Sequence, residues 1–201
     1  MLAPLSMGFR SFVFFAFVLM STAKATSMPC PILFSGSPAH KKVQKYYDVV
    51  RSFYGPGRAQ RSDLPWINHI EEGLIILESI NASWKAKAAW CIHPLVQGDA
   101  DLKAQFAVLQ KLDPQVVALA LEYRSVANET LSDTPFKKVE EVRLSPLKDV
   151  NDMLIADKVQ NRKDFDRFHQ GTHLRSKELD QYFRTWLARL GVSETRYQAY
   201  V

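Results

Sequence analysis

The apolar residues between His40 and Leu190 recur with the period of about 3.6 residues that is typical of amphipathic helices. No stretch of useful length alternates apolar and polar residues as a half-buried strand would. We therefore predict an all-α protein. The segments with this period are 43–53, 67–80, 86–92, 102–112, 113–123, 146–159 and 179–190. The polar stretch 128–146 is predicted to be a loop, with room for a short helix at 136–142.

The chain length favours one globular domain with an N-terminal extension. A chain of 201 residues that is 47% hydrophobic can bury one substantial core. We place this domain at residues 41–192 and interpret 193–201 as a C-terminal tail. Gly55-Pro56-Gly57 and Gly191 are expected to end the first and the last helix of the domain.

The first 25 residues are predicted to be a signal or targeting segment. Arg10 precedes nine apolar residues at 12–20, and Ala23-Lys24-Ala25 has the small-x-small pattern of a cleavage site. A membrane anchor and a mis-assigned start codon are the alternatives. Residues 26–40 are rich in Ser and Pro, contain no acid and are predicted to be a disordered leader of the transit type. Secretion and import into an organelle such as a plastid both fit, and a start near Met28 would give a cytoplasmic protein.

The charge pattern bears on the kind of partner. The formal charge of +5 is spread along the chain without a block of like charges. Such a diffuse excess suits a small anionic molecule or no particular partner, and gives little reason to expect nucleic-acid binding. The two cysteines, Cys30 and Cys91, do not make a disulfide framework. No stable membrane span is expected after processing.

Two histidines and one aspartate stand among apolar neighbours in three different segments. They are His69, His93 and Asp157, and together they are ligand types that a divalent cation takes in the core of a helical bundle. Each has a simpler interpretation: either histidine could be an ordinary core residue, and Asp157 could pair with a Lys or Arg. His169 and His173 are four residues apart, but Gly171 lies between them and a solvent-exposed position is favoured.

Three motifs in this order resemble a known family. They are R-S-x-x-P-aromatic-I-x-H at 61–69, A-A-apolar-x-x-H at 88–93 and A-D-x-x-x-N at 156–161. This order is similar to that of the HD-domain hydrolases of the RelA/SpoT type, in their small single-domain form. Those enzymes remove pyrophosphate from guanosine tetra- and pentaphosphate. The resemblance implies an HD-domain helical bundle over most of residues 41–192.

The resemblance also implies roles for particular residues. His69, His93 and Asp157 would hold a divalent metal, which is manganese in the family. Arg61 and Ser62 match a basic residue and a serine at the substrate, and Asn161 matches an asparagine that lines the nucleotide pocket. The chemistry is consistent with this assignment, because a metal generates a nucleophile from water and neighbouring cations neutralise phosphate oxygens.

The sequence departs from the family pattern directly after the second histidine. The family continues H-D-x-x-E-D, whereas this chain has Pro94 at the position of the fourth ligand and Gln97-Gly98 in place of the acid pair. Asp99, Asp101 and Glu72 are the candidates that could replace the lost ligand or base. Two functions therefore stay open: a metal-dependent phosphohydrolase, or a catalytically altered relative that binds a nucleotide or another partner without hydrolysis.

Overall fold

The computed structural model describes residues 38–59, 62–132 and 138–201. The predicted targeting segment 1–25, most of the leader and Arg61 lie outside the described residues. Within them the protein is all-α, with no strand beyond one isolated bridge between Arg58 and Pro65, and the predicted fold class is confirmed. The helices are α1 Pro38–Tyr54, α2 Ile67–Ser79, α3 Trp84–Ile92, α4 Asp99–Leu109, α5 Pro114–Glu129, α6 Lys148–Phe168, α7 Ser176–Arg189 and α8 Glu194–Gln198, with 3₁₀ turns η1 His93–Val96 and η2 Val139–Glu141.

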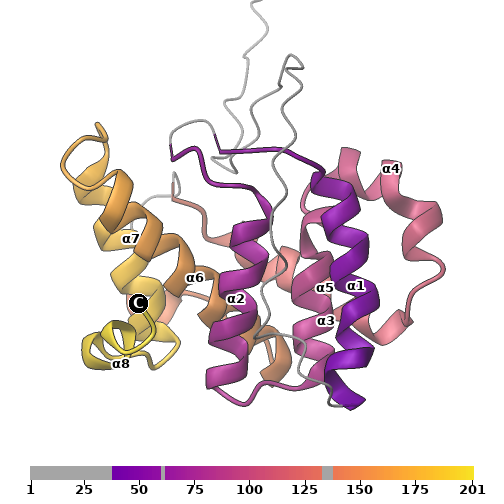
Figure 1. Ribbon diagram of the computed structural model, residues 1–201. Helices are drawn as coiled ribbons and strands as arrows, with labels where there is room; N and C mark the ends of the chain where they lie inside the picture. The colour runs from indigo at the N-terminus through magenta and orange to yellow at the C-terminus, as the bar shows by residue number, and fades with distance from the viewer. Residues whose placement is uncertain (1–37, 60–61, 133–137) are drawn as a thin grey trace, which may run out of the picture.

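Helix α3 is the centre of the bundle. It packs against α1, α5 and α6, and six of its nine residues are buried. Ser83 caps it by accepting a hydrogen bond from the Ala86 backbone at 3.0 Å. Figure 1 shows α1, α3 and α5 together, α2 and α6 beside them, and α7 and α8 beyond α6.

The contact between α2 and α3 depends on Gly73. A Cβ atom on this residue would lie 2.2 Å from the indole ring of Trp90. The indole Nε1 donates a hydrogen bond of 3.0 Å to the carbonyl oxygen of Ile70. Because Trp90 is also one helical turn before His93, this close packing fixes the distance between the two segments that carry the histidines.

Several boundaries differ from the sequence-based expectation. Helix α1 begins at Pro38, so the last residues of the expected 26–40 leader are helical. Helix α6 continues to Phe168, because its polar residues after Val159 find partners on neighbouring helices. The expected 193–201 tail contains α8, which is held to the domain by buried Tyr197, whose hydroxyl donates to Asp166 at 2.7 Å. None of the described helices is both long enough and apolar enough to cross a membrane.

Candidate functional site

The predicted metal ligands meet at one cavity. Its volume is about 310 Å³, and α2, η1, α5, α6 and α7 all contribute to its wall. Ser62 and Asn161 also line it, so five of the predicted site residues share one space. The polar and aromatic side chains of the wall include Tyr54, Ser62, Trp66, Asn68, His69, His93, Gln97, Tyr123, Asn128, Asp157, Lys158, Gln160, Asn161, Asp164, His169, His173, Arg175 and Tyr182.

His93 is a buried and neutral imidazole. Its Nδ1 lies 2.6 Å from the carbonyl oxygen of Trp90, which can only accept, so Nδ1 carries the proton and Nε2 the lone pair. The ring packs between Trp90 and Tyr123, with centroid distances of 4.4 and 5.1 Å. Burial, followed by the nearby His69, lowers the pKa of His93 to about 3. His93 is therefore ready to act as a ligand without losing a proton.

His69 lies next to His93, and its Nδ1 also faces an oxygen atom. The two ring centroids are 5.4 Å apart, and the Trp90 ring is 4.9 Å from His69. The Nδ1 of His69 lies 2.6 Å from the side-chain oxygen of Gln160. Its Nε2 lies 3.9 Å from Oδ1 of Asp157.

Asp157 is a buried carboxylate with several partners. Lys158 Nζ lies 2.8 Å from Oδ2, Asn161 Nδ2 donates to Oδ1 at 2.7 Å, and the Tyr123 hydroxyl is a further hydrogen-bond partner. Burial alone would raise the pKa of Asp157, but the Lys158 ammonium and then His69 outweigh it and lower the pKa below its usual range. The pairing with a basic residue, one of the two interpretations of Asp157, is thus present in the structure.

Lys158 is a buried cation at the same cavity. Besides Asp157, its ammonium contacts the Tyr182 hydroxyl at 3.0 Å and lies over the rings of Tyr182 and Trp186. Burial lowers its pKa, but the Asp157 carboxylate outweighs this and raises the pKa above the ordinary lysine value. The cavity therefore contains a fixed positive charge beside the two imidazoles.

The side chains of His69, His93 and Asp157 are of the kinds that bind a divalent metal, but they are not arranged around one point. In the parts of the chain that the structure describes, no group of three His, Cys, Asp or Glu side chains is already arranged to hold a metal ion. Ligand atoms that each lie about 2.0–2.2 Å from one metal are about 3.0–3.5 Å apart. The 3.9 Å between His69 Nε2 and Asp157 Oδ1 is slightly longer. A small side-chain rotation, with displacement of the Asn161 amide from Oδ1, would bring these atoms within reach of one ion.

The predicted replacement acids lie elsewhere. Asp99 and Asp101 are in the first turn of α4 and are not part of the cavity wall. Asp99 pairs with Arg124 and its side chain is 86% exposed, whereas Asp101 accepts a hydrogen bond from the Gly98 backbone at 3.2 Å. Gln97 still lines the cavity but neither aspartate does, so the geometry does not support a ligand or base role for Asp99 or Asp101.

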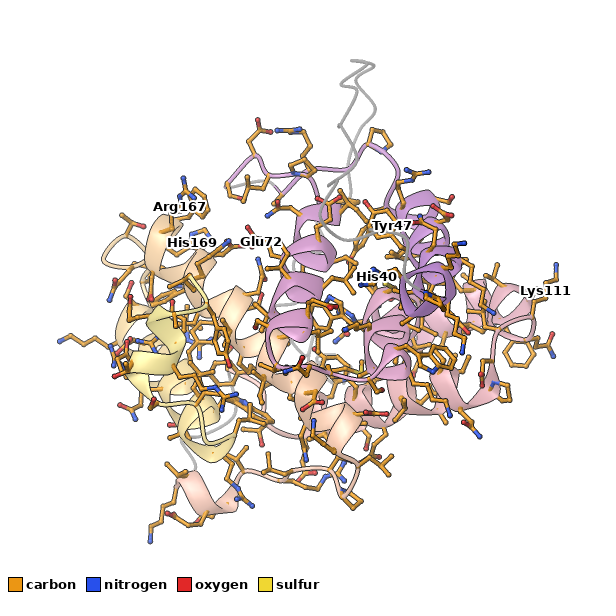
Figure 2. The ribbon with its side chains drawn as sticks, turned by 60° about the horizontal axis from the view of Figure 1, so that its bottom comes forward. His40, Tyr47, Glu72, Lys111, Arg167 and His169 are labelled. Atoms are coloured by element: carbon orange, nitrogen blue, oxygen red, sulfur yellow. The ribbon has the colours of Figure 1, made fainter. Side chains whose placement is uncertain are left out.

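Glu72 does not line the cavity, but it contacts Gln160, which does. Its Oε2 accepts a hydrogen bond from Gln160 at 3.1 Å and pairs with Lys163. Burial alone would raise its pKa, but hydrogen bonds from Lys163 and Gln160 outweigh this and lower it. Figure 2 labels Glu72 on α2 and His169 at the end of α6, on the same side of the bundle. Glu72 contacts a residue that contacts His69, which differs from the catalytic role predicted from the sequence.

Several cavity residues were not predicted from the sequence. Gln160 and Lys158 look like ordinary helix residues, and only the fold shows that they are buried. Asp164, one turn after Gln160, also lines the cavity, and burial raises its pKa. His169 and His173 are half-buried and belong to the wall, which corrects the expectation that both face solvent. They lie on the turn between α6 and α7, where helical spacing is no guide.

Comparison with known proteins gives no relative. No family model matches the chain, and neither the curated proteins nor the solved structures contain a match. The fold and site thus define an all-α protein whose cavity contains two imidazoles, a carboxylate and a buried lysine.

Proposed function

We propose that the cavity is the site of a metal-dependent phosphohydrolase that acts on a nucleotide pyrophosphate, with guanosine tetra- or pentaphosphate as the candidate substrate. One observation carries the proposal. Nδ1 of each imidazole lies 2.6 Å from an oxygen atom, the side-chain oxygen of Gln160 for His69 and the Trp90 carbonyl for His93, and Nε2 of His69 lies 3.9 Å from Oδ1 of Asp157. This arrangement of an outer acceptor behind each imidazole is typical of metal-binding histidines.

Residues of the cavity would have separate roles in the proposed hydrolysis. His69, His93 and Asp157 would hold a divalent cation such as manganese, which when bound lowers the pKa of a water molecule and supplies a hydroxide nucleophile. The Lys158 ammonium is a fixed positive charge that would stabilise negative charge on the phosphate oxygens. Ser62 and Asn161 would contact the nucleotide from the cavity wall.

A second function is binding of a nucleotide without hydrolysis. It is favoured by the position after His93, where Pro94 cannot be a ligand, and by the cavity wall, which includes neither Asp99 nor Asp101. A site that lacks a carboxylate ligand and a well-placed base could keep its affinity and lose turnover.

One experiment separates the two functions. The full chain is incubated with manganese and a panel of nucleoside di-, tri- and tetraphosphates that includes guanosine tetraphosphate, and released phosphate and pyrophosphate are measured beside binding by calorimetry. Release that is lost in His69→Ala supports the hydrolase. Saturable binding without release supports the second function. Neither release nor binding for any nucleotide contradicts both.

A further inference from the structure

Gln160 connects His69 to two carboxylates. It lies on α6 and is almost fully buried, with 2% of its surface exposed. Its side-chain oxygen lies 2.6 Å from Nδ1 of His69 on α2. Its side-chain nitrogen donates to Oδ2 of Asp164 at 2.6 Å and to Oε2 of Glu72 at 3.1 Å. Each hydrogen-bonding atom of the amide therefore has a partner.

These partners determine which way the amide points. Carboxylate oxygens accept hydrogen bonds, so the amide must present its NH₂ group to Glu72 and Asp164. The opposite orientation would place an amide oxygen against two carboxylates and leave a buried NH₂ group facing the imidazole. The loss of a buried hydrogen bond of this kind costs about 1–3 kcal/mol. Gln160 consequently offers only an acceptor to His69.

The orientation of the amide in turn selects the tautomer of His69. A neutral imidazole carries one proton, which can be on either nitrogen, and an acceptor opposite Nδ1 stabilises the form in which Nδ1 carries it. We propose that Gln160 is a positioning residue that holds neutral His69 in its Nδ1–H form, with Glu72 and Asp164 holding the Gln160 amide. The Nε2 lone pair then faces Asp157.

The consequence for metal binding rests on the proposed function. An imidazole in the other tautomer presents an N–H group where the cation needs a lone pair, so a fraction of the molecules would not be competent to bind. Loss of an outer acceptor of this kind typically weakens metal affinity about 10–100-fold. The inference gives Glu72 a role at the site that does not require it to touch water or substrate.

Nitrogen NMR tests the tautomer directly and without metal. The full chain is labelled with ¹⁵N-histidine and studied without metal at about pH 8.5, above the ordinary histidine pKa of about 6.5. The His69 signals are assigned by comparison with His69→Phe. The wild-type protein is expected to show a protonated Nδ1 and an unprotonated Nε2 at His69.

Gln160→Met removes the acceptor and keeps a side chain of similar length. This variant is expected to give a mixture of both His69 tautomers, while His93 keeps its Nδ1–H form, because its acceptor is the Trp90 backbone. The unchanged His93 signal also shows that the variant is folded. Gln181→Met on α7, which removes a side-chain contact to Thr185, is the matched control and should leave His69 unchanged.

The outcomes separate this inference from the proposed function. A wild-type His69 in the Nε2–H form, or a Gln160→Met variant that keeps the Nδ1–H form fully, overturns the inference. A change of tautomer in Gln160→Met alone supports it, whether or not manganese binds. Manganese affinity, measured separately by titration, is expected to fall at least tenfold in Gln160→Met, and an absence of binding to wild type would remove only the proposed function.

Discussion

The ammonium of Lys158 lies 2.8 Å from Oδ2 of Asp157, and both side chains are buried although the residues are neighbours in the sequence. Adjacent residues on a helix normally point in different directions. Here the two side chains meet because Tyr182 and Trp186 of α7 cover the lysine, and the hydroxyl of Tyr182 holds its ammonium. The ammonium balances the negative charge of Asp157, so the carboxylate stays ionised although it is buried.

Lys158→Met is expected to destabilise the protein strongly, because it leaves the Asp157 carboxylate buried without its cation. Breaking one side of a buried pair costs about 3–5 kcal/mol. Urea unfolding measures this loss, and the double variant Asp157→Asn with Lys158→Met should regain most of it. Arg58→Met removes an exposed ion pair with Asp63 and should cost at most about 1 kcal/mol. Equal losses in Lys158→Met and Arg58→Met would contradict the importance of the buried pair.

His93 is expected to make the metal-free protein less stable in acid. Burial first, and then His69, lower its pKa from 6.5 to about 3, so the unfolded chain binds a proton that the folded protein does not. Its contribution to stability is fully present above pH 6.5 and falls as the pH decreases from 6.5 towards 3.

The size of this effect can be measured against a variant. Each pH unit in that window removes roughly 1 kcal/mol from the free energy of unfolding. His93→Gln, which can still donate to the Trp90 carbonyl, should reduce the slope by about one proton. Urea unfolding in EDTA at several pH values between 7 and about 4.5 gives both slopes. Parallel slopes would show that His93 is protonated in the folded state as readily as in the unfolded state.

Gly73→Ala is expected to destabilise the protein, although alanine is the better helix former by about 1 kcal/mol. The new Cβ would lie 2.2 Å from the Trp90 ring, and overpacking of this kind costs about 1–3 kcal/mol. Ser52→Ala on the exposed face of α1 is the control and should be nearly neutral. A lower melting temperature together with a changed tryptophan fluorescence is the expected result. A Gly73→Ala variant that is more stable than wild type would contradict this prediction, because it would show that α2 and α3 can move apart to make room for the new Cβ.

Asp99→Asn and Asp101→Asn are expected to leave manganese affinity within about twofold of wild type. Asp99 forms an exposed pair with Arg124, and such pairs contribute about 0–1 kcal/mol. Asp101 caps the start of α4, a contribution of about 0.5–2 kcal/mol to stability. Manganese titration of the folded variants checks this. A tenfold loss of affinity in either variant would restore the role that the sequence suggested for that residue.

The helices could be predicted from the sequence because the apolar period is a local signal. The starts of α3 and α5 show local signals of the same kind, because Ser83 caps α3 and Pro114 stands in the first turn of α5. The end of α6 was not, because its residues after Val159 are mostly polar and become buried only through partners on other helices. Arg162, for example, makes two hydrogen bonds of 2.8 Å with Glu194 on α8.

The site residues also differ in whether the sequence around them carries a local signal. His69, His93 and Asp157 stood out because each interrupts an apolar pattern, and the fold brings them to one cavity. Gln160 could not be identified, since its partners His69 and Glu72 are 91 and 88 residues away in the chain. Asp99 and Asp101 were chosen because they follow His93 closely, but they lie in the first turn of α4, contact Arg124 and the Gly98 backbone, and do not line the cavity.

Binding of manganese to the full chain tests the central proposal most directly. Titration of the metal-free protein, with bound ion measured by elemental analysis after gel filtration, should give one equivalent per chain. His69→Ala and Asp157→Asn should each lose it, while Asp99→Asn should retain it. A wild-type chain that takes up no manganese, or one whose uptake is the same in His69→Ala, would contradict a metal centre formed by these residues.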